Sequence, residues 1–100
     1  LCFGAMTFHG GSKLFKMIGA TQQDEADQLI KACVDKGVNF FDTADVYSEG
    51  GSEEMLGQAF RNLGIQRKDV VIATKCFGRV GKGHNDIGAS RKHIIEAVDA

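Results

Sequence analysis

The sequence predicts an α/β fold with a parallel sheet, and three observations support this prediction. Short apolar runs rich in β-branched or aromatic residues alternate with longer segments whose apolar residues recur at helical spacing. The run 70–74 is continuously apolar or β-branched, which is typical of a strand buried on both faces. Helical segments of this length between such strands imply parallel pairing through right-handed crossovers.

Composition indicates one small globular domain. The chain has 100 residues, a formal net charge of -1 and 25% charged residues, a balance that gives no reason to expect nucleic acid or a membrane surface as partner. The longest apolar run falls well short of the roughly 20 residues needed to span a bilayer. Cys2, Cys33 and Cys76 lack close pairing and zinc-type spacing, so we expect reduced thiols in a cytoplasmic protein and no metal site.

The first strand and helix are expected before residue 38. Residues 1–6 form a short apolar strand in which Gly4 would let another group approach the backbone closely. Residues 7–19 are expected to be a loop, and Thr21 is expected to cap a helix that ends at Gly37. The apolar face of this helix would consist of Ala26, Leu29, Ile30, Cys33 and Val34.

The second repeat follows the same plan. Residues 38–43 are expected to be a strand, Ser52 is expected to cap the next helix, and Gly64 to end it. The apolar face of that helix would consist of Met55, Leu56, Ala59, Phe60 and Leu63.

The third repeat begins after a polar link at residues 67–69. The strand 70–74 leads into a glycine-rich loop over 77–88, and Ser90 is expected to cap a helix. Its apolar face would consist of Ile94, Ile95 and Val98. Because the chain does not start with Met and this helix still continues at its last residue, we expect both ends to extend further.

Two architectures use this repeating unit, the open doubly wound sheet and the closed eight-stranded barrel. No Gly-x-Gly-x-x-Gly turn follows the first strand, which weakens the dinucleotide-binding form of the open sheet. A complete barrel needs about 250 residues. In a barrel, this chain would therefore form the first three β/α repeats.

An acid and an amine stand where two predicted strands end. Asp42 closes the strand 38–43 and Lys75 follows the strand 70–74, while Tyr47 lies on the loop after Asp42. The carboxyl ends of parallel strands are where sites are built. An ammonium beside a phenol favours the phenolate, and an acid beside the ammonium keeps it charged. Tyr47 could then act as general acid toward a carbonyl oxygen, with a nicotinamide supplying the hydride. The alternative is a structural Asp42–Lys75 ion pair with Tyr47 as a rim aromatic.

Longer motifs identify a family. The run 37–47, Gly-Val-Asn-Phe-Phe-Asp-Thr-Ala-Asp-Val-Tyr, and the run 51–57, Gly-Ser-Glu-Glu-Met-Leu-Gly, strongly resemble the signature of the aldo-keto reductases. The runs 71–75 and 90–94 resemble later segments of the same family, and residues 3–8 resemble the turn of its first strand. The resemblance covers nearly the whole chain, in the expected order.

This resemblance implies an eight-stranded α/β barrel that reduces small aldehydes or ketones with NADPH. Tyr47 matches the proton donor, Lys75 the lysine that makes the phenol more acidic, and Asp42 the acid that holds the lysine. The turn of the first strand and Asp42 border the nicotinamide in this family. The cofactor-binding candidates are therefore Gly4, Ala5, Met6 and Asp42, with Ala5 in place of the more frequent Thr.

Several other residues receive simpler interpretations. The family's catalytic histidine follows a later strand than this chain contains, and it matches none of His9, His84 and His93. We expect His9 near the substrate mouth, His84 in a solvated loop, His93 in the first turn of a helix and Cys76 in buried packing. A solvated basic surface is expected for Arg79, Lys82 and Lys92, with contact to cofactor phosphate as the alternative.

Two rival functions stay open. The potassium-channel β subunits resemble the reductases, bind the cofactor and serve mainly as regulatory partners, so the protein could be a binding module. The 100 residues alone could also be inactive, because three repeats would expose a sheet edge and lack the histidine. The sequence leaves the carbonyl substrate and the oligomeric state open.

Overall fold

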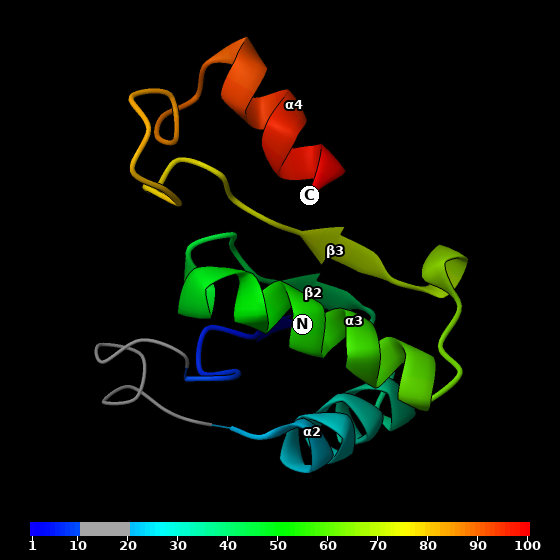
Figure 1. The fold of residues 1–100 in the computed structure, drawn as a ribbon. Coiled ribbons are helices and arrows are strands. Elements are labelled where there is room, and N and C mark those ends of the chain that lie inside the picture. The colour runs from blue at the N-terminus through cyan, green and yellow to red at the C-terminus, as the bar shows by residue number, and fades with distance from the viewer. Residues whose placement is uncertain (11–20) are drawn as a thin grey trace.

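A computed structural model describes residues 1–10 and 21–100. The loop expected over residues 7–19 lies outside the described residues from residue 11 onward. Strands and helices alternate as expected, with two short 3₁₀ turns added between them (Figure 1). The strand–helix alternation predicted from the sequence is confirmed.

The sheet consists of β1 (Cys2–Gly4), β2 (Phe40–Asp42) and β3 (Val71–Ala73), in that order and parallel throughout. Parallel pairing is therefore confirmed. Each strand is shorter than its apolar run. The register places Gly4 and Ala73 on either side of Asp42, so these three residues form one row across the sheet.

Helix α2 (Gln23–Asp35) follows β1 and ends as expected. Gly37 adopts φ +80°, a left-handed conformation that glycine reaches without steric cost, and its N–H bonds to the carbonyl of Val34. The expected cap was wrong, because the residue before the helix is Gln22. Thr21 instead pairs with Phe8 in an isolated parallel bridge, which ties the segment after β1 to the start of the helix.

Helix α3 (Gly51–Asn62) also starts differently from the expectation. A 3₁₀ turn, η1 (Tyr47–Gly50), leads directly into it, and the cap position is Gly50 in a left-handed conformation. Ser52 is the second helical residue and is completely buried. The assignment of Ser52 as the cap was wrong because its hydroxyl bonds to distant residues rather than to its own helix.

After a second 3₁₀ turn, η2 (Arg67–Asp69), and β3, the chain ends in helix α4 (Arg91–Asp99). Ser90 caps this helix as expected, and its hydroxyl oxygen accepts the N–H of His93 at 3.1 Å. Figure 1 shows α2 and α3 side by side, whereas α4 stands apart beyond β3. Consequently its apolar residues Ile94, Ile95 and Val98 are exposed rather than packed.

The core lies between the sheet and the pair of helices α2 and α3. Phe41 of β2 is fully buried there and contacts Phe60 of α3 edge-on, with ring centroids 5.1 Å apart. The other buried apolar members are Ala5, Phe8, Ala26, Ile30, Met55, Leu56, Ala59 and Val70. Phe40, one residue from Phe41, points to the opposite face and stays partly exposed.

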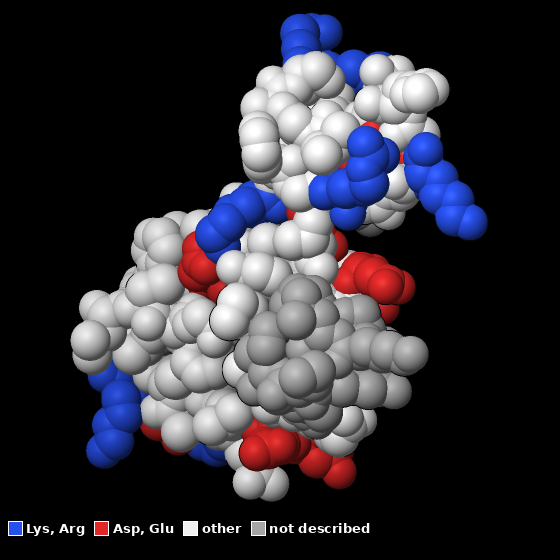
Figure 2. Space-filling view, turned by 90° about the vertical axis from the view of Figure 1, so that its left-hand side faces the viewer, with Lys and Arg blue, Asp and Glu red and all other residues white. Residues whose placement is uncertain are grey.

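The expectation that the strand 70–74 is buried on both faces was wrong. Val71 is 50% exposed, because β3 is the edge of the described sheet and the face opposite α2 and α3 is uncovered among the described residues. No helix in the described part of the chain is long and apolar enough to cross a membrane. Figure 2 shows charges of both signs on the surface, with basic side chains gathered on the upper part.

Candidate active site

The ammonium group of Lys75 joins the residues expected to carry the chemistry. Its Nζ lies 2.6 Å from Asp42 Oδ1, 2.7 Å from the carbonyl oxygen of Thr43 and 3.5 Å from the hydroxyl of Tyr47. An ammonium has three protons to donate, and these three acceptors account for them. Nζ also lies 5.0 Å from the centroid of the Tyr47 ring, within cation–π distance. Asp42, Tyr47 and Lys75 therefore meet as the sequence predicted.

Strand geometry explains why Asp42 and Lys75 meet. Asp42 is paired in register with Ala73, and residues two apart along an extended chain project from the same face. Lys75 therefore projects from the same face as Asp42, two residues beyond the end of β3. This is the face opposite α2 and α3, where the Asp42 side chain is 34% exposed and that of Lys75 50%.

The contacts with Asp42 and Tyr47 keep Lys75 charged. Burial lowers the pKa of Lys75, but hydrogen bonds to Asp42 and Tyr47 and the electrostatic attraction of both groups outweigh it. The pKa is consequently raised above its ordinary value of 10.5. Below that pH the group stays an ammonium, so its positive charge stands beside the Tyr47 hydroxyl at neutral pH.

The turn that carries Tyr47 has an uncommon backbone conformation. Ser48, Glu49 and Gly50 all have positive φ, at 52°, 59° and 91°. A left-handed conformation costs a residue with a side chain about 1 kcal/mol or more, so contacts must hold the turn. The buried Ser48 hydroxyl donates to the carbonyl of Phe8 at 2.9 Å, and the N–H of Tyr47 donates to the carbonyl of Ala44 at 3.1 Å.

A buried hydroxyl pair connects the site to the first strand. Ser52 donates to the carbonyl of Ala5 at 2.7 Å, and its oxygen lies 2.9 Å from Oγ1 of Thr43. Because Ser52 has one proton and gives it to Ala5, Thr43 must donate to Ser52. The carbonyl of Thr43 in turn accepts from Lys75. The ammonium is therefore linked through Thr43 to Ser52 of α3 and to the residue that follows β1.

Removing this hydroxyl is expected to destabilise the fold. Ser52→Ala leaves the buried hydroxyl of Thr43 without its partner, so we expect the free energy of unfolding to fall by about 1–3 kcal/mol. Urea denaturation of the intact protein measures this loss. In the Ser52→Ala background, Thr43→Val should cost less than it does alone, because no unpaired group is then left. An unchanged urea midpoint for Ser52→Ala would contradict the role given to this pair.

The residues expected to border a cofactor lie at the same end of β1. Gly4 is exposed and stands beside Asp42 in the row across the sheet, and an added side chain there would meet no atom within 4 Å. Met6 is 41% exposed. Ala5 is fully enclosed, and its N–H donates to the carbonyl of Asp42 at 2.9 Å. Gly4 and Met6 are thus accessible, while Ala5 joins β1 to β2.

The other singled-out residues have local roles in the structure. The ring of His9 packs on Gly51, where an added Cβ would lie 2.5 Å from its Nδ1. His84 is exposed in its loop, and Cys76 is only partly buried. Arg79 donates to the carbonyls of Gly81 and Gly83, Lys92 bonds to Glu96, and Lys82 is exposed.

Some contributors were not predicted. Ser48 and the Thr43–Ser52 pair bond to residues 40 or more positions away or to a hydroxyl on another element, and sequence spacing gives no signal for such contacts. The buried position of His93 was also missed, although its place in the first turn of α4 was expected. In residues 1–10 and 21–100, no group of three or more His, Cys, Asp or Glu residues is arranged to hold a metal ion.

The model of the Aldo/keto reductase family matches residues 1–100. The chain belongs to this family. The resemblance inferred from the motifs around Asp42, Tyr47 and Lys75 is therefore confirmed at the level of the family.

Similar proteins include potassium channel β subunits and a reductase. The chain is 57% identical over 74 residues to a probable voltage-gated potassium channel subunit beta of Oryza sativa subsp. japonica, a match that covers 74% of this chain and 22% of the relative. It is 54% identical over 76 residues to the Arabidopsis thaliana protein of the same description, covering 76% and 23%. It is 41% identical over 95 residues to versiconal hemiacetal acetate reductase of Aspergillus parasiticus, covering 78% and 28%. The chain thus spans less than a third of these relatives.

Proposed function

We propose that the protein reduces small aldehydes or ketones to alcohols with NADPH, using Tyr47 as the general acid. The observation that carries this proposal is the Lys75 ammonium, bonded to Asp42 at 2.6 Å and within 3.5 Å of the Tyr47 hydroxyl. Membership of the aldo/keto reductase family and the similarity to a reductase support an oxidoreductase activity.

The residues at the end of the sheet fit a nicotinamide cofactor. In the row Gly4–Asp42–Ala73, the two outer residues are small, and the space beside Gly4 is open among the described residues. A flat ring could therefore lie against Gly4 next to Asp42, with Met6 at its edge. When bound there, the cofactor would supply the hydride that side chains cannot provide.

The chain's own residues would handle the proton. Tyr47 would donate its hydroxyl proton to the carbonyl oxygen of the substrate, while the Lys75 ammonium stabilises the phenolate that remains. Asp42 fixes the ammonium in place and keeps it charged. The hydrogen bonds of Ser48 and Ser52 hold the backbone on both sides of Tyr47, so that the phenol needs little reorganisation to act.

The parallel strands would be the first three repeats of an eight-stranded barrel. A barrel would cover the open face that carries Phe40, Asp42 and Lys75, and its carboxyl end would hold the site. The three free cysteines agree with a cytoplasmic location.

A regulatory role is the second candidate. Two relatives are described as potassium channel β subunits, at 57% and 54% identity. A protein of that kind could bind NADPH at the same site and serve mainly as a partner of another protein. The presence of Asp42, Tyr47 and Lys75 together favours the enzyme.

A turnover assay separates the two candidates. The intact protein is incubated with NADPH and a panel of aldehydes, with NADH in parallel, and cofactor oxidation is followed at 340 nm, where reduced nicotinamides absorb. Oxidation that depends on the aldehyde and favours NADPH is expected. Tight NADPH binding without turnover on any aldehyde would favour the regulatory role instead. Residues 1–100 alone are expected to be inactive.

A further inference from the structure

Three buried side-chain atoms in the described part of the chain have no hydrogen-bond partner. They are both carboxylate oxygens of Asp45 and Nε2 of His93. His93 is only 3% exposed. Burying a charged or polar group without a partner is costly, and such groups in folded proteins are nearly always satisfied. These two side chains therefore call for an explanation.

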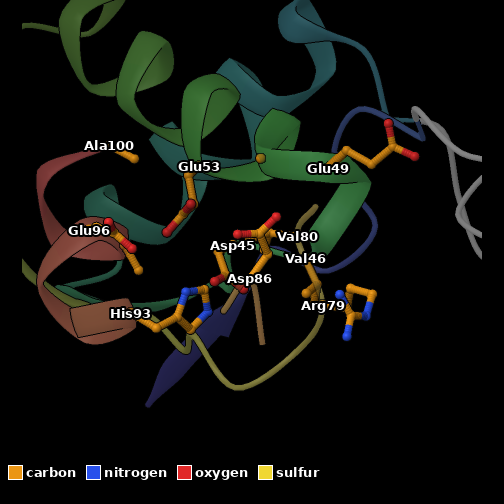
Figure 3. Close-up of a pocket in the computed structure, with 12 residues that line it drawn as sticks. Asp45, Val46, Glu49, Glu53, Arg79, Val80, Asp86, His93, Glu96 and Ala100 are labelled. Atoms are coloured by element: carbon orange, nitrogen blue, oxygen red, sulfur yellow. The ribbon is translucent and has the colours of Figure 1, made fainter. Parts of the chain in front are cut away.

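Both side chains line the same cleft. It has a volume of about 340 Å³ and lies between the segment from Asp45 to Glu53 and helix α4. In Figure 3 the imidazole of His93 reaches from α4 toward the carboxylates of Asp45 and Asp86. A donor on one side and an acceptor on the other are thus available in one place.

Asp45 is the better partner of the two acids. Oδ2 of Asp86 already accepts the backbone N–H of Gly83 at 2.7 Å, whereas both oxygens of Asp45 are unpaired in the described structure. Pairing Asp45 with His93 satisfies atoms on both residues at once. Pairing His93 with Asp86 would leave the Asp45 carboxylate buried alone.

The backbone of Asp45 is part of the candidate active site. Its N–H donates to the carbonyl of Lys75 at 3.1 Å. Asp45 also lies in the short loop between Asp42 and Tyr47. A displacement of Asp45 would therefore move both the Lys75 backbone and the turn that presents the phenol.

The backbone of His93 is held in place at the start of α4. It lies in the first turn of α4, and its own N–H is bound by the cap residue Ser90 at 3.1 Å. The glycine-rich loop 77–88 lies between Lys75 and this helix, so the covalent connection from α4 to the site is long. A contact from His93 to Asp45 would connect the helix to the site directly.

We propose that His93 is a positioning residue: the two side chains, unpaired as the structure places them, pair across the cleft. The Nε2–H of His93 then donates to the Asp45 carboxylate and holds the loop that carries Tyr47 against α4. This inference rests on the proposed function for its effect on turnover. The proposed hydrogen bond itself does not depend on that function, because it is inferred from unpartnered atoms of two side chains that line one cleft.

The test compares substitutions of His93 in the intact protein. His93→Phe keeps the ring and removes the donor, and we expect kcat for aldehyde reduction to fall by up to about 100-fold with NADPH binding unchanged. His93→Gln keeps a donor near the position of Nε2 and should restore most of kcat. His84→Phe, a matched change at an exposed histidine, should leave kcat unchanged. Stability is measured by urea denaturation for each variant.

A double-mutant cycle identifies the partner. In the Asp45→Ala background, His93→Phe should have little further effect on kcat or on the urea midpoint, because the hydrogen bond is already lost. If the effects of His93→Phe and Asp45→Ala on the urea midpoint add, the proposed pair is overturned. The same holds if the effect of His93→Phe disappears in the Asp86→Asn background instead. A His93→Gln variant as slow as His93→Phe would overturn the positioning role. If the wild type reduces no aldehyde, the proposed function fails, and the stability cycle alone still decides whether the pair exists.

Discussion

Replacing Tyr47 by Phe is expected to lower kcat for carbonyl reduction by about 10²- to 10⁴-fold, the usual contribution of a general acid. The substitution removes only the hydroxyl, which lies 3.5 Å from the Lys75 ammonium, and leaves the ring that the ammonium also approaches. The row of Gly4, Asp42 and Ala73 is unaffected. NADPH binding, measured by fluorescence titration, should therefore be retained.

Stability distinguishes a catalytic loss from a structural one. The hydrogen bonds that hold the turn come from Ser48 and from the backbone N–H of Tyr47, and both remain in Tyr47→Phe. The urea midpoint should stay close to that of the wild type. Turnover at the wild-type rate would show that another group donates the proton.

Replacing Lys75 by Met should lower kcat by about 10²- to 10³-fold, because it removes a preorganised charge beside the reacting phenol. Met has a similar length and no charge, so the space is filled while three hydrogen bonds are lost. NADPH titration and a steady-state assay at saturating aldehyde measure the two effects separately. Equal kcat for Lys75→Met and the wild type would leave Asp42–Lys75 as a structural ion pair.

The raised pKa of Lys75 sets the sign of a pH effect on stability. Because the folded pKa lies above 10.5, the ammonium stabilises the fold fully below that pH, and this contribution disappears as the pH rises through the folded pKa. The gain is small, since the Lys75 side chain is half exposed. The urea midpoints of wild type and Lys75→Met should differ by a constant amount at neutral pH and converge in strong alkali.

Local signals in the sequence located some helix ends correctly. Gly37, Gly64 and Ser90 were placed properly because positive φ and a capping hydroxyl depend on the residue and its immediate neighbours. Thr21 and Ser52 were misassigned as caps. Their hydroxyls could cap a helix as well as that of Ser90 does. The path of the chain before each helix instead places Gln22 and Gly50 at the cap positions.

The central residues of the site were predictable for a similar reason. Asp42 ends one recognisable strand and Lys75 follows another, and parallel strands bring their carboxyl ends together whatever the rest of the fold. Tyr47 is only five residues from Asp42. By contrast, Ser48 bonds to Phe8, which lies 40 positions earlier in the sequence. The side chains of His93 and Asp45 face the same cleft because of the path of the loop 77–88.

From the sequence alone follow the alternation of strands and helices, the parallel sheet, the family motifs and the trio Asp42, Tyr47 and Lys75, because each depends on short-range patterns. Tertiary structure alone decided which hydroxyls cap helices and which hold the site, how far β3 is covered, and that Asp45 and His93 line one cleft. Those features depend on which distant segments meet, and the free energy of burying a polar group is set by the partner it finds there.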